Sequence, residues 1–377
     1  MSGRFSPRRI ALTLAAPVLA IIFSLLIASI VLLAVGDSPL VVFQAMLDYG
    51  VRPRTMVLTI NTATTYYLSA VAVAIGFKMN LFNIGVDGQY RLAAMLAAAV
   101  GGAISLPSPL HALVVVLVAM LVGAMWAGIA GVLRAYRGVS EVISTIMLNA
   151  IATGVIAYML RPGRLAVSTQ GSNNIGTKPI PESGHVPGFA FVPGTETKVY
   201  GFVFLAVLVG VAYWYMLNRT RFGFDLRATG MSESAAVSSG VSVKRMIVTA
   251  MLLSGAVAGL VGMPQLLGGS YSYSLDFPAG LGFTGIAIAL LGRNNPVGIA
   301  FGALLWAFLT NSAQILDLEG VPKEIANIMQ GTIVLSVVVA YELVRRYRLR
   351  EQQQQVGEQV AEEPPTPRTG SDMGAPV

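Results

Sequence analysis

Residues 110–133 read LHALVVVLVAMLVGAMWAGIAGVL, a stretch of apolar and small residues that contains no Asp, Glu, Lys or Arg. A helix of about 20 such residues is long enough to cross the hydrocarbon core of a bilayer. Backbone polar groups cannot stay unpaired in lipid, so a spanning segment has to be a helix or part of a closed barrel. The stretch lacks the two-residue alternation of barrel strands, and it therefore predicts a membrane-spanning helix.

The whole chain has the composition of a membrane protein. Of its 377 residues, 55% are hydrophobic and only 11% are charged, whereas soluble domains are typically about 25% charged. We expect an all-α, polytopic membrane helix bundle of about ten spans. The predicted spans are residues 10–35, 55–77, 84–104, 110–133, 141–160, 199–217, 246–267, 281–291, 296–316 and 324–343. The run 281–291 is short, and Gly280, Gly282 and Gly285 indicate a broken or partial helix there.

Lysine and arginine residues predict the orientation of these spans. When ten spans alternate from an inner N-terminus, most of the 25 Lys and Arg residues fall on the side that carries both termini. Cytoplasmic loops of membrane proteins carry such an excess, so we expect both termini in the cytoplasm. The same distribution accounts for the net charge of +7, and we expect no nucleic-acid partner.

Polar segments divide the chain further. Residues 1–350 are expected to form one transmembrane domain, with an extracellular polar loop at 161–198 and a cytoplasmic loop at 218–245. The first of these segments is rich in Gly, Pro, Ser, Asn and Thr, too polar for lipid and too long for a simple turn. Residues 351–377 are rich in Gln, Glu and Pro and cannot build a core, so we expect a disordered cytoplasmic tail.

Small residues recur at four-residue spacing within two predicted spans. Gly255 and Gly259 lie in one of them, and Ala124 and Gly128 lie in the other. Faces of this kind let two helices approach closely. We expect ordinary packing within the chain, with a subunit interface as the alternative.

Several classes of chemistry are excluded by residues that the sequence lacks. It contains no cysteine and only two histidines, His111 and His185, so disulfides, thiolate sites and a histidine-based metal site are not expected. There is no Gly-x-x-x-x-Gly-Lys-Ser/Thr loop to bind nucleotide, no Gly-x-Ser-x-Gly elbow and no His-Glu-x-x-His pair. We therefore expect no catalytic residue and no bound metal or cofactor in this chain.

The densest polar cluster at membrane depth is residues 80–91, NLFNIGVDGQYR. A charge at the bilayer centre is costly, so such residues are usually paired or functional. Asp87 and Arg91 are four residues apart and can pair on one helix face. Gly85 and Gly88 permit a non-helical entry to the span, as in broken helices that line transporter cavities. The alternative is an interfacial loop with a structural ion pair.

Further polar side chains lie on other spans and could line a path for a small polar solute. The candidate path residues are Asn61, Thr65, Asn83, Asp87, Asn149 and Asn311. Amides can hydrogen-bond a neutral polar solute, although any one of them could equally serve a bond between helices.

The cytoplasmic segment 224–241 reads FDLRATGMSESAAVSSGV. Its Ala, Leu, Met and Glu residues favour a short helix, and Gly240 suits the helix end. The segment is amphipathic and flanked by basic residues. It could lie on the membrane lipid surface or dock into a protein partner, and the pattern alone favours neither.

At four stretches the chain resembles a known family. These stretches are 80–89 (NLFNIGVDGQ), 141–149 (EVISTIMLN), 223–241 and 282–298 (GFTGIAIALLGRNNPVG). They resemble the permease subunits of ATP-binding-cassette importers, in the branch that includes ribose, nucleoside and branched-chain amino acid permeases. The resemblance covers about residues 50–345 and is nearest to the nucleoside permeases. One departure is Asp87, where the family usually has Glu.

The resemblance implies a complex in a bacterial plasma membrane. Its other members would be two ATP-binding-cassette ATPase subunits that hold ATP and Mg, a second permease subunit and an extracellular substrate-binding lipoprotein. In such families a cytoplasmic helix seats in a groove of the ATPase, and here it maps onto residues 225–241. The matching residues are Asp225, Arg227, Ala228, Gly230, Glu233, Ala236 and Gly240. The segment 161–198 would then dock the binding protein.

These observations predict ATP-driven uptake of nucleosides by alternating access. Ribose or another simple sugar, and branched-chain amino acids, are alternative substrates of the same machinery. A secondary transporter driven by an ion gradient would need an intramembrane acid, for which Asp87 is the clearest candidate. A membrane enzyme or scaffold would bind or react without moving solute.

Overall fold

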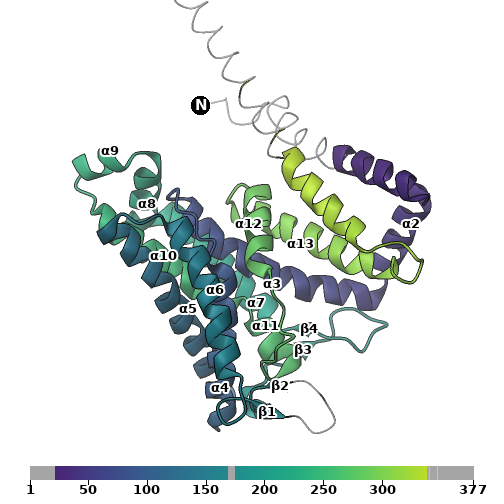
Figure 1. Ribbon diagram of the computed structural model, residues 1–377, viewed down its shortest axis with the longest axis horizontal. Coiled ribbons are helices and arrows are strands. Elements are labelled where there is room, and N and C mark those ends of the chain that lie inside the picture. The colour runs from purple at the N-terminus through teal and green to yellow at the C-terminus, as the bar shows by residue number, and fades with distance from the viewer. Residues whose placement is uncertain (1–21, 169–174, 338, 340–345, 347–377) are drawn as a thin grey trace, which may run out of the picture.

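The computed structural model describes residues 22–168, 175–337, 339 and 346 (Figure 1). The described chain is mostly helical, as predicted, with four very short strands. Its long helices are α3 (Pro53–Phe77), α4 (Val86–Ala103), α5 (Leu110–Arg137), α6 (Glu141–Met159), α7 (Phe202–Arg219), α10 (Val243–Leu260) and α13 (Pro296–Ser312). After α10 the chain continues through α11 (Met263–Gln265) and the π-helical turn η2 (Leu266–Ser270). The predicted short helix is present as α12 (Leu281–Leu291).

Within the described residues, six helices are long and apolar enough to cross a membrane. The number rises to seven if the helices Ile22–Val35 and α2 (Pro39–Gly50), bent by 116° against each other, form one span. Three further predicted spans do not meet this criterion. Helix α4 is too polar and α12 is too short, while the last predicted span, 324–343, is described without a gap only as the helix Glu324–Val337. The predicted total of about ten is therefore not confirmed by helix length and composition.

The N-terminal region differs from the prediction. Residues 10–21 of the first predicted span lie outside the described residues, as does the predicted tail 351–377. The described part of that span ends near Gly36, whose φ of 99° is a left-handed conformation that glycine adopts readily. Pro39 then starts α2, which the sequence reasoning missed. Proline is favoured at the first position of a helix because its missing N–H would have no partner there.

Small residues allow the central helices to pack closely. Gly255 and Gly259 of α10 face α5, and an added Cβ at either position would overlap the backbone of Gly123 or Ala119. The close approach of two helices at such positions maximises van der Waals contact. The prediction that these small-residue faces serve packing within the chain is confirmed for this pair of helices.

The segment 161–198 is ordered in its described residues. It contains the hairpin β1 (Val167–Ser168) with β2 (Ile175–Gly176), the turn η1 (Glu182–Gly184), and β3 (Gly188–Phe189), which pairs with β4 (Val199–Tyr200). The N–H of Thr177 donates to Tyr273 O over 2.8 Å, and the N–H of Ile180 donates to Tyr271 O over 2.8 Å. The segment therefore packs on the chain between η2 and α12. β1 and β2 lie at the end of the bundle opposite α8 (Arg221–Met231) and α9 (Glu233–Ser238) (Figure 1).

Candidate functional site

The chain between α3 and α4 folds back into the bundle and carries Asn83 into its interior. Asn83 is 0% exposed, and its amide donates to Ser254 Oγ over 2.8 Å. Ser254 in turn donates to the carbonyl of Ala72 over 2.7 Å. Ala72 is five residues before the end of α3, which corresponds to about 7.5 Å along the helix. The amide of Asn83 therefore lies within the helix bundle rather than at its surface.

A pair of amides holds this segment in place. Asn83 and Gln89 exchange hydrogen bonds of 3.0 and 2.8 Å through their side chains. The same Asn83 carbonyl oxygen accepts a bond of 3.1 Å from the N–H of Gly85. Buried polar groups are stable only when they are paired in this way. The segment is consequently a defined structure and not a loose loop.

Asp87 is buried in the first turn of α4. Its carboxylate lies 3.8 Å from the guanidinium of Arg91, so the predicted pair on one helix face is confirmed. It also accepts a hydrogen bond of 2.7 Å from the N–H of Gly280, the residue that caps α12. A carboxylate at a helix N-terminus is stabilised by the unpaired N–H groups and by the helix dipole. The positive charge of Arg91 and the partial positive charge at the N-terminus of α12 thus compensate the buried carboxylate of Asp87.

Glycines bring α12 close to α3 and α4. An added Cβ at Gly282 would lie 2.5 Å from the backbone N of Asp87, and one at Gly285 would overlap the hydroxyl of Ser69. Ser69 donates to the carbonyl of Leu281 over 2.7 Å. The short helix α12 therefore points its N-terminus at Asp87 with backbone-to-backbone contact. This is the arrangement by which broken helices place a polar end inside a membrane bundle.

Helix α6 completes the cluster. The side-chain oxygen of Asn149 accepts a bond of 2.8 Å from Gly88 N–H, and its amide donates 3.0 Å to Ile84 O. Arg91 donates to Thr153 one turn further along α6 over 3.3 Å. Of the six predicted path residues, the structure thus brings together Asn83, Asp87 and Asn149.

The other three path residues lie elsewhere. Asn61 sits about 16 Å before Ala72 along α3, where it donates to Lys198 O over 3.0 Å and accepts from Tyr200 N–H over 2.8 Å. Those bonds fasten β4 to α3. Asn311 is buried and donates to Ala307 O of its own helix over 2.8 Å. Thr65 is partly buried on α3. The hydrogen bonds described for Asn61 and Asn311 thus go to other parts of the chain, and the part of these three residues in a path stays a prediction.

The cluster also contains residues that the sequence reasoning missed. Ser254, Thr153 and the N–H of Gly280 each bond to one of its members. A serine among the small residues of α10, and a threonine one turn after Asn149, were signals available in the sequence. A backbone N–H leaves no such signal.

The predicted coupling segment forms two helices instead of one. Thr220 accepts from Gly223 N–H over 3.1 Å at the start of α8, and Ser232 accepts from Ala235 N–H over 3.3 Å at the start of α9. Serine and threonine are preferred at such positions because they satisfy an unpaired N–H. Gly240, with φ of 83°, follows the end of α9 as expected. Glu233 and Gly240 are exposed, Asp225, Arg227, Ala228 and Gly230 are half-buried, and Ala236 is buried.

Helix α8 contacts the same segment that leads to Asn83, and α9 contacts α5. The amide of Asn80 donates to Gly230 O over 2.6 Å, and an added Cβ at Gly230 would lie 2.5 Å from Lys78 O. Arg134 joins Glu233, at 4.0 Å, to the buried Glu141, at 3.4 Å. Direct contacts therefore connect α8 to the segment before α4, and Arg134 connects α9 to the start of α6.

The family of the chain follows from comparison with known proteins. A family model described as the permease component of the branched-chain amino acid transport system matches residues 55–338. The chain belongs to this family. It is thus a membrane-integral permease subunit of an ATP-binding-cassette transporter and not an enzyme, and membership implies ATPase and substrate-binding partners in general.

Three relatives of this permease cover most of its length. It is 35% identical to the guanosine ABC transporter permease protein NupP of Bacillus subtilis, over 87% of this chain and 93% of that protein. It is 32% identical to the nucleoside ABC transporter permease protein NupB of Lactococcus lactis, over 86% and 90% of the two chains. It is 31% identical to the glucose ABC transporter permease protein TsgB13 of Haloferax volcanii, over 88% and 89%. No solved structure matches the chain.

Proposed function

We propose that this permease is the transmembrane subunit of an ATP-driven importer of nucleosides. The observation that carries the proposal is the buried cluster of Asn83, Asp87 and Asn149, which direct contacts connect to the exposed helices α8 and α9. The names of two similar proteins, a guanosine permease and a nucleoside permease, support nucleosides as the substrate class.

The proposed complex contains two ATPases, a second permease and an extracellular substrate-binding lipoprotein. ATP and Mg would be bound by the ATPases, since this sequence has no phosphate-binding loop. In this proposal the chain crosses a bacterial plasma membrane about ten times with both termini in the cytoplasm. The excess of Lys and Arg on one side of the predicted spans supports that orientation.

The solute path in this proposal runs beside α6. Its outward face is apolar and exposed at Ile143, Met147 and Ile151, which suits contact with the second permease. The side chains of Arg91 and Thr153 join at the edge of this face and are not fully buried. Charged and amide groups at this depth can hydrogen-bond the hydroxyl groups of a ribose and the edges of a base.

The contacts of the coupling helices support alternating access as the mechanism. Closure of the ATPases would displace α8 and α9. Their contacts through Asn80 and Arg134 would shift the segment 78–85 and with it the amide of Asn83 and the carboxylate of Asp87. The bistable element is this re-entrant segment, held by few but specific polar bonds.

A sugar importer is the second candidate, because a glucose permease is 31% identical to this chain. Ribose and branched-chain amino acids are further alternatives within the same mechanism. An ion-coupled transporter is less well supported, since Asp87 already faces Arg91 and the N–H of Gly280.

The test is uptake of labelled nucleoside into vesicles that contain this permease with its ATPase, its permease mate and its binding protein. We expect ATP-dependent accumulation that excess unlabelled nucleoside blocks and excess glucose, ribose or leucine does not. Accumulation of a sugar or an amino acid instead would replace the substrate and keep the mechanism. Uptake that survives ATP depletion and collapses with the proton gradient would overturn the ATP-driven mechanism.

A further inference from the structure

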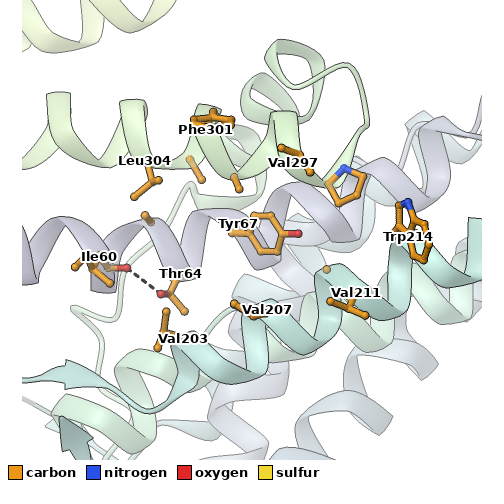
Figure 2. A pocket seen from close by; sticks show the side chains of 16 residues that line it. Ile60, Thr64, Tyr67, Val203, Val207, Val211, Trp214, Val297, Phe301 and Leu304 are labelled. Carbon is orange, nitrogen blue, oxygen red and sulfur yellow. Dashed lines mark hydrogen bonds between the residues drawn. The ribbon is translucent and has the colours of Figure 1, made fainter. Parts of the chain in front are cut away.

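A second feature lies away from the polar cluster, on the flank of the bundle. Helices α3, α7 and α13 enclose a groove of about 590 Å³ whose lining is almost entirely apolar (Figure 2). Figure 2 shows Val207 and Val211 of α7 facing Val297, Phe301 and Leu304 of α13 across this space. No solute with many polar groups would find hydrogen-bond partners here.

Small side chains create the groove. Gly210 lies opposite Tyr67, and an added Cβ there would overlap the tyrosine hydroxyl. Ala300 and Ala303 line the groove from α13. The hydroxyl of Thr64, one of the few polar groups in the lining, is bonded to Ile60 O of its own helix over 2.8 Å, as the dashed line in Figure 2 marks. The groove is therefore concave because Gly210, Ala300 and Ala303 are small, and it stays apolar because the hydroxyl of Thr64 is bonded within its own helix.

The groove opens at the surface of the described chain. The side chains of Val207 and Phe301 are 61% and 71% exposed. Both belong to helices, α7 and α13, that are long and apolar enough to span a membrane. The lining of α7 extends from Val203 to Trp214, which is about 16 Å along the helix. That length is about half the hydrocarbon core and so equals one leaflet.

Positive charge marks one end of the groove. The guanidinium of Arg219 lies 5.9 Å from the ring of Trp214, which lines that end. Arg293 is exposed and precedes Pro296, another lining residue, by three positions. The pKa of Lys78 is lowered by burial and by the charges of Arg227 and Arg293, which indicates a positive field at this end. In the predicted orientation this end faces the cytoplasm, whose leaflet carries anionic lipids.

We propose that the groove binds one acyl chain of an anionic phospholipid, with the lipid phosphate at Arg219 and Arg293. The apolar groove accounts for the chain, and the basic end accounts for the headgroup, as in basic pockets between membrane helices. Helix α7 runs directly into α8 through Thr220. A lipid held there contacts the helix that leads to the coupling segment.

The experiment uses the full chain purified in mild detergent. Bound phosphatidylglycerol and phosphatidylethanolamine are counted by native mass spectrometry, and a phosphatidylglycerol with a photoreactive acyl chain maps the contact by cross-linking. We expect cross-links in α3, α7 and α13 and a preference for phosphatidylglycerol. Ala300→Trp fills the groove and lowers binding at least fivefold, whereas Ala212→Trp, an exposed position of α7 outside the lining, leaves it unchanged.

Two more variants keep the test decisive if Ala300→Trp fails to fold. Val207→Trp narrows the groove from the opposite helix and should have the same effect. Arg219→Gln should reduce the preference for the anionic lipid about fivefold, the contribution of one basic residue near an anionic headgroup. Equal binding of the two lipids, or cross-links outside these three helices, would overturn the proposal. These measurements do not depend on which solute is transported.

Discussion

The carboxylate of Asp87 accepts a hydrogen bond of 2.7 Å from the backbone N–H of Gly280, although 193 positions separate the two residues. The bond joins the first turn of α4 to the residue that caps the N-terminus of α12, and Arg91 neutralises the same carboxylate from one turn away. The N-termini of α4 and α12 and the ion pair with Arg91 therefore meet at the buried carboxylate of Asp87. Asp87 thus ties α4 to α12 within the candidate path.

Replacing Asp87 with alanine should destabilise the permease substantially. The change leaves the Gly280 N–H and the Arg91 guanidinium without their acceptor in a largely buried site. Breaking a buried pair from one side costs about 3 kcal/mol or more. Thermal unfolding of the detergent-purified chain measures the effect.

Asp317→Ala is the matched control for this prediction. Asp317 pairs with Lys323 at 3.1 Å, but both side chains are exposed, and exposed pairs contribute about 0–1 kcal/mol. Asp87→Glu, which restores the acid usual in the family, should keep most of the stability because it keeps the charge. If Asp87→Ala and Asp317→Ala unfold at the same temperature, Asp87 does not organise the site.

Gly282→Ala should separate α12 from α4. Its Cβ would lie 2.5 Å from the backbone N of Asp87, and backbone atoms cannot move aside as a flexible side chain can. Forcing extra atoms into a packed site typically costs about 1–3 kcal/mol. We expect lower stability and loss of transport in the assembled complex.

Gly331→Ala serves as the comparison for Gly282→Ala. An added Cβ at Gly331 meets no atom within 4 Å, and alanine is the better helix former by about 1 kcal/mol. This variant should therefore be as stable as the original or slightly more stable. Equal behaviour of the two variants would show that the close approach of α12 to Asp87 does not matter.

The sequence predicted local features of this site well. The bounds of α12 were predicted correctly because glycines surround a short apolar run. The pair of Asp87 and Arg91 followed from helical spacing alone. Features of this kind depend on residues within one or two turns of each other, and those are the relations that a sequence displays.

The structural features that were not predicted depend on contacts between residues far apart in the sequence or on the effect of a single side chain. The hydrogen bond from Gly280 to Asp87 is donated by a backbone N–H, so no pattern of side chains in the sequence indicates it. The bonds from Asn61 to Lys198 and Tyr200, which hold β4 on α3, were not predicted, and the part of Asn61 in a path stays a prediction. Ser232 divided the expected coupling helix in two because its hydroxyl caps α9 better than it continues α8.

Asn80→Gly should disconnect α8 from the re-entrant segment. Asn80 has a φ of 56°, a conformation that glycine adopts without strain, so the substitution removes only the amide that bonds to Gly230 O. The stability loss should stay near 1 kcal/mol. In the assembled transporter we expect ATP hydrolysis that no longer rises when loaded binding protein is added.

Asn294→Gly is the matched control, because Asn294 has a φ of 54° and its backbone carbonyl, which accepts from Tyr213, remains. Stimulation of ATP hydrolysis should be normal in this variant. Glu233→Gln, which weakens the contact with Arg134, should reduce stimulation in the same direction as Asn80→Gly. Full stimulation in both Asn80→Gly and Glu233→Gln would contradict transmission through these contacts.

Lys78 should make the stability of the permease depend on alkaline pH. Burial and the charges of Arg227 and Arg293 lower its pKa in the folded chain from the ordinary 10.5. Between the lowered pKa and 10.5 the unfolded chain binds more protons than the folded one, so stability rises with pH across that window.

At lower pH the charged Lys78 destabilises the fold, and Lys78→Met should therefore unfold at a higher temperature than the original chain. The difference between the two should shrink as pH rises through the lowered pKa and reach its minimum near 10.5. Unfolding curves of both chains at a series of pH values measure this, and a difference that is constant or grows with pH would contradict the assignment.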